Sequence, residues 1–359
     1  MTDNSSAIIM IVGLLIGWVV LLGGIWWWAK FSRRTKLAKP LGNPQVSAST
    51  GAVLLAIDVP KENDKKPMAA ETLFASLHGI GESRLSFEIE AKEKSIRFYV
   101  WVPMHLRGYV ESQLYAQYPE IEILEMKDYA DPSKAPANLV AVGTELILNR
   151  EDFYPIKTFL NFDVDPLAAI TGTLSKLEEH QHIWIQMIVQ PESNQWRDAA
   201  IKYINDMRSG NRTAGLVRDV ASGLAKLGGE VVGTMVRGGS YIPSEAEVKK
   251  VELSPGVEAA LKEIEAKSSK LGFRTTIRLV VFDRDEQLAK SRMQLTVGVF
   301  KQFNSNNLNS FEVSELLVNR LEVAQRYAER QSGGSHSFIL NVTELASIYH
   351  LPNKKWLQK

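Results

Sequence analysis

His180 and His182 are the residues whose type and spacing come closest to a chemical site. They follow Glu178 and Glu179 at the start of a predicted strand, where a spacing of two places both imidazoles on one face. Because imidazole and carboxylate groups bind zinc, a metal site is one interpretation of this cluster. The other is a polar helix-to-strand corner, with Trp184 beside it in the core. We favour the corner, and we expect neither a metal nor a cofactor.

Motifs for the common catalytic mechanisms do not occur in the sequence. The glycines of GGEVVGTMVRGG (228–239) lack the Lys and hydroxyl residues with which a phosphate loop binds phosphate and metal. There is no HExxH helix, no G-x-S-x-G elbow, no EF-hand loop and no cysteine. Absence of cysteine also excludes disulfides and is compatible with a reducing compartment. We therefore expect a protein that binds rather than catalyses.

Charge and aromatic content argue against a nucleic-acid interface. Without residues 1–39 the chain keeps 37 of its 42 basic residues and 40 of its 41 acidic residues, whereas a broad nucleic-acid footprint requires a basic surplus. The predicted strand IRFYVWV (96–102) is aromatic, as the sheets of some RNA-binding domains are, but it lacks their glycine-rich basic pattern. We expect no direct binding of nucleic acid by this chain alone.

The first predicted element of the chain is an apolar helix at residues 7–29. Its 23 residues, at about 1.5 Å each, span about 34 Å and so cross a bilayer core. A cleaved signal peptide is the rival interpretation, but the apolar run is too long and its basic flank follows it. The residues that indicate the headgroup depth and, by the positive-inside rule, the cytoplasmic side are Trp26, Trp27, Trp28, Lys30, Arg33, Arg34 and Lys36.

This pattern predicts a single-pass protein of the bacterial inner membrane, with residues 1–6 outside and a soluble body in the cytoplasm. Residues 30–52 are predicted to be a basic juxtamembrane segment and linker. The lipid bilayer is thus the first expected partner.

The body is predicted to be α+β, with two ferredoxin-like modules at residues 53–130 and 137–313. In the first, alternation predicts strands and helical spacing predicts helices in the order β, α, β, β, α, β, at 53–59, 67–81, 84–91, 96–103, 105–119 and 120–126. The second repeats this order at 138–148, 165–179, 182–190, 273–285, 286–303 and 308–313.

A helical insertion at 193–271 is predicted to interrupt the second module. It contains a helix in NQWRDAAIKYINDMRS and another in SPGVEAALKEIEAKSSKLG, where Ser254 can cap the helix and Pro255 occupy its first position. The glycine-rich stretch 209–243 between them is either a stripe that binds the membrane or a partner helix, or a loop. Residues 314–359 are predicted to be a C-terminal helical segment.

Several stretches resemble one family: FYVWVP, YVESQLYAQYPEIEI, GFRTTIRLVVF and, above all, ILNVTELASIYHLP. They are similar to the membrane-anchored amino-terminal region of bacterial type IV secretion and conjugative DNA-transfer ATPases of the coupling-protein class. In that family, such a region precedes a RecA-like motor. The chain departs from the pattern because it ends at Lys359, where such a motor would start, so the resemblance does not imply ATP hydrolysis here.

The resemblance implies a membrane-anchored, non-catalytic component of a secretion or conjugation machine, which holds or regulates a separate ATPase motor. It also implies a homo-oligomer, since such motors form rings. The expected contacts with the motor are Leu345, Ile348, Tyr349 and Leu351, for which a packed core is the alternative.

Two other hypotheses stay open at this point. One is a membrane-bound module that binds a small molecule or peptide and has no part in secretion. The other is an enzyme with an unrecognised site, for which Glu178, His180 and His182 would be mutated first.

Overall fold

A computed structural model describes residues 51–93, 95–136, 138–209, 253–332 and 336–353. The chain divides into two units, residues 1–50 and 51–359, and the described residues belong to the second. Within the described ranges, no helix is both long enough and apolar enough to cross a membrane. The predicted anchor at 7–29 and its basic flank lie outside the described residues, as does almost all of the glycine-rich stretch 209–243.

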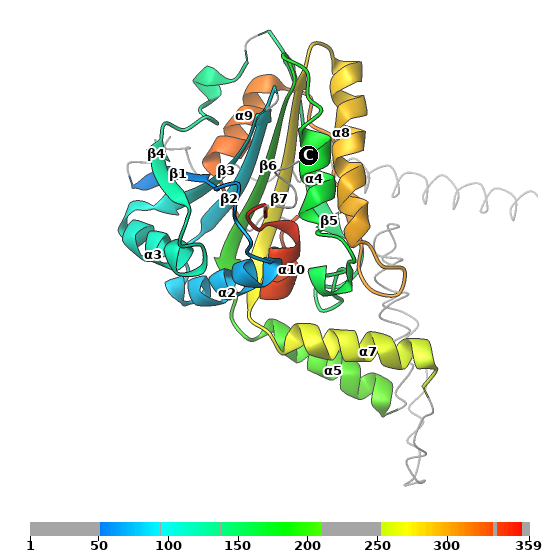
Figure 1. Cartoon of the computed structure of the whole chain (residues 1–359). Helices are drawn as coiled ribbons and strands as arrows, with labels where there is room; N and C mark the ends of the chain where they lie inside the picture. Colours follow the sequence, from blue (N-terminus) through cyan, green and yellow to red (C-terminus); the bar gives the residue numbers. More distant parts are fainter. Residues whose placement is uncertain (1–50, 94, 137, 210–252, 333–335, 354–359) are drawn as a thin grey trace, which may run out of the picture. The chain divides into compact units, whose positions relative to one another are not determined.

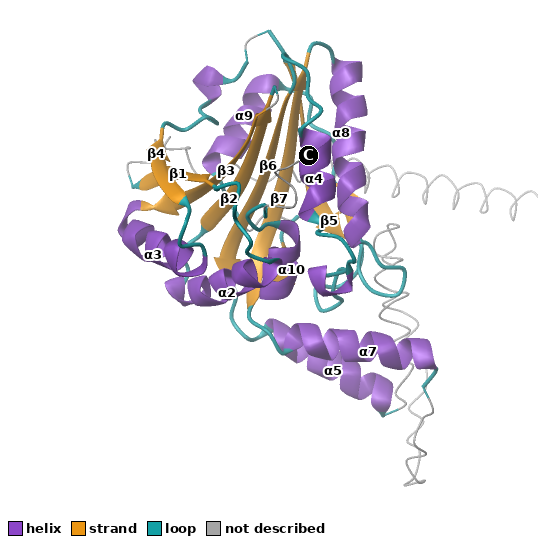
Figure 2. Ribbon diagram, viewed as in Figure 1, coloured by secondary structure: helices purple, strands orange, loops and turns teal. Residues whose placement is uncertain are grey.

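The described residues form a mixed α+β structure around one antiparallel sheet (Figure 2). Its main path has the order β4-β1-β3-β2-β6-β7-β5-β8, and β9 pairs with β7. The strands are β1 (Ala52–Asp58), β2 (Leu85–Lys92), β3 (Ser95–Pro103), β4 (Glu122–Met126), β5 (Val140–Leu148), β6 (His182–Pro191), β7 (Gly272–Asp283), β8 (Phe311–Val313) and β9 (Phe338–Asn341).

The two halves of the sheet, β1 to β4 and β5 to β8, join through their β2 and β6 strands. These two strands pair antiparallel from Leu85↔Val189 to Lys92↔His182. Within each half the third strand lies between the first and second, and the fourth flanks the first. Because the pairing at the junction runs the full length of β2, the halves are continuous in backbone hydrogen bonding.

Eight α-helices accompany the sheet in the described ranges: α2 (Pro67–Leu77), α3 (Arg107–Gln117), α4 (Leu167–Leu174), α5 (Trp196–Arg208), α7 (Pro255–Ser268), α8 (Glu286–Phe300), α9 (Arg320–Glu329) and α10 (Val342–Ile348). One face carries α2, α4, α8 and α10, and α9 lies behind the sheet (Figure 1). Alternation explains the two sides: Leu85, Phe87 and Ile89 join the main core, whereas Trp184 packs with Val323 and Tyr327 on the α9 side.

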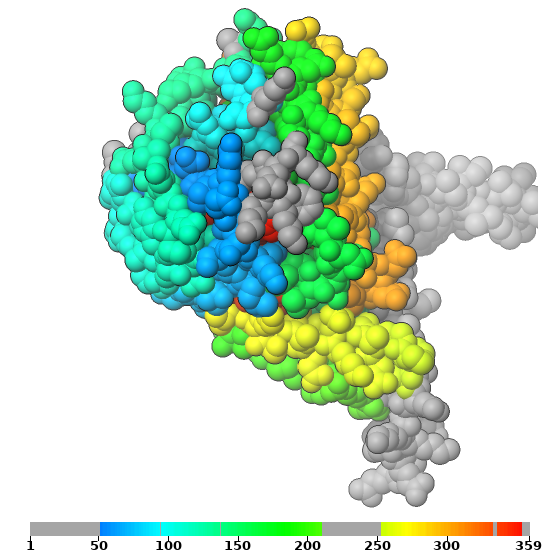
Figure 3. Space-filling view, in the orientation of Figure 1, coloured from blue at the N-terminus to red at the C-terminus, as the bar shows by residue number. Residues whose placement is uncertain are grey.

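The helices α5 and α7 form an arm that is inserted between β6 and β7 (Figures 1 and 3). Ala200, Ile204, Leu261 and Ile264 form a separate apolar cluster between them. Ser254 is the N-cap residue of α7 and Pro255 its first residue, as predicted, although the Ser254 side chain makes no capping hydrogen bond. At the base of the arm, the indole of Trp196 occupies the space that a Cβ atom at residue 272 would need, so only glycine fits there without a shift.

The C-terminal segment differs from the all-helical prediction for 314–359. It contains α9 and α10, but Phe338–Asn341 forms β9 between them. β9 pairs with the first residues of β7, from Gly272↔Asn341 to Thr275↔Phe338, whereas β5 pairs only from Ile277 onward. The physical reason is that the 12-residue β7 extends beyond β5 and leaves an edge that a short apolar run can fill.

Candidate functional site

A row of polar residues crosses the sheet face that α9 covers. Glu88 on β2 lies opposite Gln186 on β6, which lies opposite Arg278 on β7, which in turn lies opposite Glu145 on β5. The Gln186 Nε2 atom donates to Glu88 Oε1 at 3.0 Å, and Arg278 Nε donates to Glu145 Oε1 at 2.7 Å. The row therefore connects the two halves of the sheet through side chains as well as backbone.

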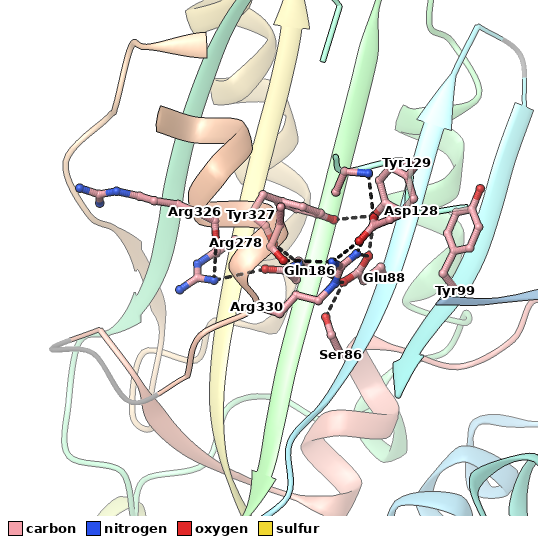
Figure 4. A network of polar contacts seen from close by, with 12 residues as sticks. Ser86, Glu88, Tyr99, Asp128, Tyr129, Gln186, Arg278, Arg326, Tyr327 and Arg330 are labelled. Carbon is pink, nitrogen blue, oxygen red and sulfur yellow. Dashed lines mark hydrogen bonds and ion pairs between the residues drawn. The ribbon is translucent and has the colours of Figure 1, made fainter. Parts of the chain in front are cut away.

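Arg330, which follows α9 directly, is the centre of this site (Figure 4). Its guanidinium donates to both oxygens of Glu88, from Nε at 2.7 Å and Nη2 at 3.1 Å. It also donates to both oxygens of Asp128, from Nη1 at 2.7 Å and Nη2 at 3.0 Å. The fifth N–H bonds the carbonyl of Ala328 at 3.1 Å. A guanidinium has five N–H donors, so every donor of the Arg330 side chain has an acceptor within the chain.

The same network includes two buried tyrosines. Tyr129 donates from its hydroxyl to Glu88 Oε2 at 2.8 Å, and the hydroxyls of Tyr129 and Tyr327 are 3.0 Å apart. Burial raises the pKa of both phenols well above the usual value, and the Glu88 carboxylate raises it further. Both tyrosines are therefore neutral hydrogen-bond donors at physiological pH.

An arginine held by two carboxylates within a protein interior acts mainly on structure. The Arg330 side chain is 1% exposed and that of Glu88 is 0% exposed, while Asp128 is about one-third exposed. Burial costs each ion several kcal/mol, so such groups persist only when every charge is paired and hydrogen-bonded. The ion pairs of Arg330 therefore hold three segments together: β2, the segment after β4 and the end of α9.

A second buried ion pair connects the arm with the C-terminal helix. Lys267 Nζ on α7 lies 3.1 Å from Glu344 Oε2 on α10 and donates to the carbonyl of Ile339 at 2.9 Å. Glu344 also completes a capping box with Asn341 and accepts from the Ile156 amide at 2.8 Å. Burial raises the pKa of Glu344, and Lys267 opposes that shift.

A groove of about 990 Å³ lies between the first half of the sheet and α4, and we call it the α4 groove. Its lining includes Ile57, Phe98, Leu124 and Met126 from the strands and Ala169 and Gly172 from α4. Leu124 and Met126 are exposed apolar residues on the edge strand β4. Next to Gly172 there is open space. The groove thus has apolar side chains among its strand residues and mostly small residues on its α4 side.

The predicted metal-site candidates, His180 and His182, are not part of the Arg330 network. His180 Nε2 lies 3.5 Å from the buried carboxylate of Asp283, whereas the ring of His182 packs at 6.1 Å from that of Phe282. Burial lowers the pKa of His182 to about 4. In the part of the chain that the structure describes, no three His, Cys, Asp or Glu residues are grouped as metal ligands.

The four expected contacts with a motor, Leu345, Ile348, Tyr349 and Leu351, are all buried in the main core. This is the packed-core arrangement that the sequence left open. Tyr349, for example, contacts Phe87 edge-on at 5.1 Å between ring centroids. The tryptophans and basic residues of the predicted anchor lie outside the described ranges.

Sequence reasoning missed Glu88, Asp128 and Arg330 altogether. The only available signal was the polar residue within each apolar strand, at Glu88, Gln186 and Arg278, which alternation assigns to the face opposite the main core. A charged residue at such a position normally faces solvent, so the pattern gave no reason to expect burial.

Comparisons with known proteins give one family. A family described as "Domain of unknown function (DUF8128)" matches residues 43–358. No curated protein matches the chain.

Proposed function

Since the chain belongs to the DUF8128 family, we propose from its architecture that it is a non-catalytic adaptor, anchored in the membrane, that presents a helical arm to a protein partner. The observation that carries this proposal is the Lys267–Glu344 pair. It attaches an inserted helical pair to the core of a continuous sheet. An arm attached in this way moves with the sheet and can transmit position or force.

Other contacts support a rigid body beneath the arm. The halves share the β2–β6 pairing, and Arg330 connects β2 with the segment after β4. We further propose that each half is a ferredoxin-like module, since the orders β4-β1-β3-β2 and β8-β5-β7-β6 are those expected of this fold and all pairs are antiparallel.

The partner that we propose is the ATPase motor of a type IV secretion or conjugation machine, at the inner face of the membrane. This rests on the resemblance of FYVWVP, GFRTTIRLVVF and ILNVTELASIYHLP to the coupling-protein class. The anchor that we propose is the apolar run 7–29.

Crosslinking in intact membranes followed by purification of the full chain tests the proposal. We expect mass spectrometry to recover an ATPase or another subunit of a transfer machine. Ile201→Glu, at the most exposed apolar side chain of α5, should lower this recovery at least tenfold. Leu295→Glu, at a still more exposed apolar side chain on α8, should not.

Two results would contradict the proposal. The first is recovery of no secretion or ATPase subunit from membranes. The second is digestion of the body by protease added outside intact cells, because an adaptor for a cytoplasmic motor must lie inside.

A further inference from the structure

The polypeptide reaches the α4 groove at a fixed point. His350 is buried, with Nδ1 2.8 Å from the carbonyl of Ala346 and Nε2 2.8 Å from Asp165 Oδ1. Two residues later, the carbonyl of Pro352 accepts a bond from Asn63 Nδ2 at 2.7 Å. Pro352 is buried and also lines the groove. The chain is therefore held at the groove wall one residue before Asn353, the last residue described on this side.

The sequence after Asn353 is suited to such a site. Residues 354–359 read KKWLQK, in which two apolar side chains lie between lysines. At about 3.4 Å per extended residue, six residues reach about 20 Å. The groove offers apolar contacts at Phe98, Leu124 and Met126 and volume for an indole.

The charges around the groove do not select an occupant. Asp58, Arg97 and Lys176 line it, but all three are exposed. Interactions of exposed charges are weak and are screened by salt. Apolar contact area therefore decides what binds.

We propose that the α4 groove binds residues 354–359 of the same chain, with Trp356 and Leu357 as the apolar anchors. The bound segment covers the exposed apolar residues of β4. It also places a second contact between α4, from the second half of the sheet, and the strands of the first half.

Disulfide crosslinking tests this directly, because the natural chain has no cysteine. The full chain in membranes would carry Leu357→Cys together with Ala169→Cys on the groove wall. The matched control carries Leu357→Cys with Lys65→Cys. Lys65 is exposed and lies two residues from Asn63, which contacts Pro352, yet it is not part of the groove lining.

Under a mild oxidant, the groove pair should form an intramolecular crosslink at least ten times faster than the control pair. Equal rates for the two pairs, or crosslinks mainly between two copies of the chain, would overturn the proposal.

Filling the groove provides a second test. Gly172→Phe should slow the groove crosslink at least fivefold, because the new ring occupies open space on α4. Gly298→Phe is the control, since Gly298 on α8 also has open space beside it and does not line the groove. Trp356→Ala should slow the crosslink as well, and Lys359→Ala should not. An unchanged rate with both Gly172→Phe and Trp356→Ala would contradict the proposal.

Discussion

Arg330 and Glu88, 242 residues apart in sequence, form a two-pronged ion pair in the protein interior. Arg330 has φ 46°, a left-handed conformation that costs a residue with a side chain roughly 1 kcal/mol or more. The conformation turns the guanidinium from the end of α9 back onto the sheet. The ion pair thus requires an unfavourable backbone conformation at Arg330, and the hydrogen bonds of the guanidinium stabilise that conformation.

Replacement of Arg330 should be strongly destabilising. Arg330→Met leaves the Glu88 carboxylate buried without its counter-charge, so we expect a loss of about 3–5 kcal/mol in the free energy of unfolding. Denaturant unfolding of the full chain measures this loss. The control is Arg326→Gln, whose exposed partner Glu322 is four residues away on the same helix, and which should cost about 0.5 kcal/mol or less.

The double variant Arg330→Met with Glu88→Gln should regain part of this loss, because no unpaired charge is then buried beside β2. Asp128 is about one-third exposed and can be hydrated. If the double variant were no more stable than Arg330→Met, the unpaired Glu88 charge would not be the cause.

The Lys267–Glu344 pair predicts a pH-dependent effect. Lys267→Met removes the cation that opposes the burial-driven rise in the pKa of Glu344, so that pKa should rise further. A carboxyl group with a raised pKa in the folded state destabilises the fold as pH rises through that range. Lys267→Met should therefore lose about 3 kcal/mol or more at pH 8 and clearly less at pH 5.

Stability measured at both pH values, relative to the natural chain, checks this prediction. Lys262→Met, at an exposed position on α7, should change stability little and equally at both. A Lys267→Met loss that did not depend on pH would mean that Glu344 stays ionised without its partner.

The strands were predictable because side chains alternate between two faces. Leu85, Phe87 and Ile89 identify β2 and its core face from sequence alone, and all eight strands predicted within 53–313 occur close to their expected bounds. β9 was missed because four residues of FILN carry too little periodicity, and the edge that they fill exists only once β7 has formed beside β5.

The ion pairs were not predictable for a different reason. Arg330 meets Glu88 only because the two halves of the sheet join at β2 and β6, which is a long-range property. Locally, Arg330 follows a charged helix and resembles an exposed residue. The buried positions of Leu345 and Tyr349 illustrate the converse, since helical spacing is the same for a core and for an interface.

His182 predicts a loss of stability in acid. Its pKa in the folded state is lowered to about 4, mainly by burial, against about 6.5 in an unfolded chain. The stability that this neutral ring contributes is complete above pH 6.5 and is lost as pH falls toward 4, because the unfolded state binds the proton first. The effect should be on the order of 1 kcal/mol, given the partial exposure of the ring.

His182→Gln should remove this part of the acid sensitivity, seen as a flatter dependence of the urea midpoint between pH 6.5 and 4.5. His105→Gln, at an exposed position, should leave the slope unchanged. An identical slope for His182→Gln and the natural chain would show that the ring is not protonated preferentially on unfolding.

Gly272 and Trp196 predict how the arm is attached. A Cβ at Gly272 would lie 2.6 Å from the Nε1 atom of Trp196, so Gly272→Ala should force the indole away and cost about 1–3 kcal/mol. Gly298→Ala has open space and should stabilise α8 by about 0.5–1 kcal/mol.

Hydrogen exchange shows which part of the protein the Gly272→Ala substitution loosens. Exchange should be faster in α5 of the Gly272→Ala protein but not in β2 or β6. Trp196→Leu in the Gly272→Ala background should recover part of the loss, because the smaller side chain leaves room for the added methyl group. Faster exchange throughout the sheet would instead mean that the contact supports the whole fold rather than the base of the arm.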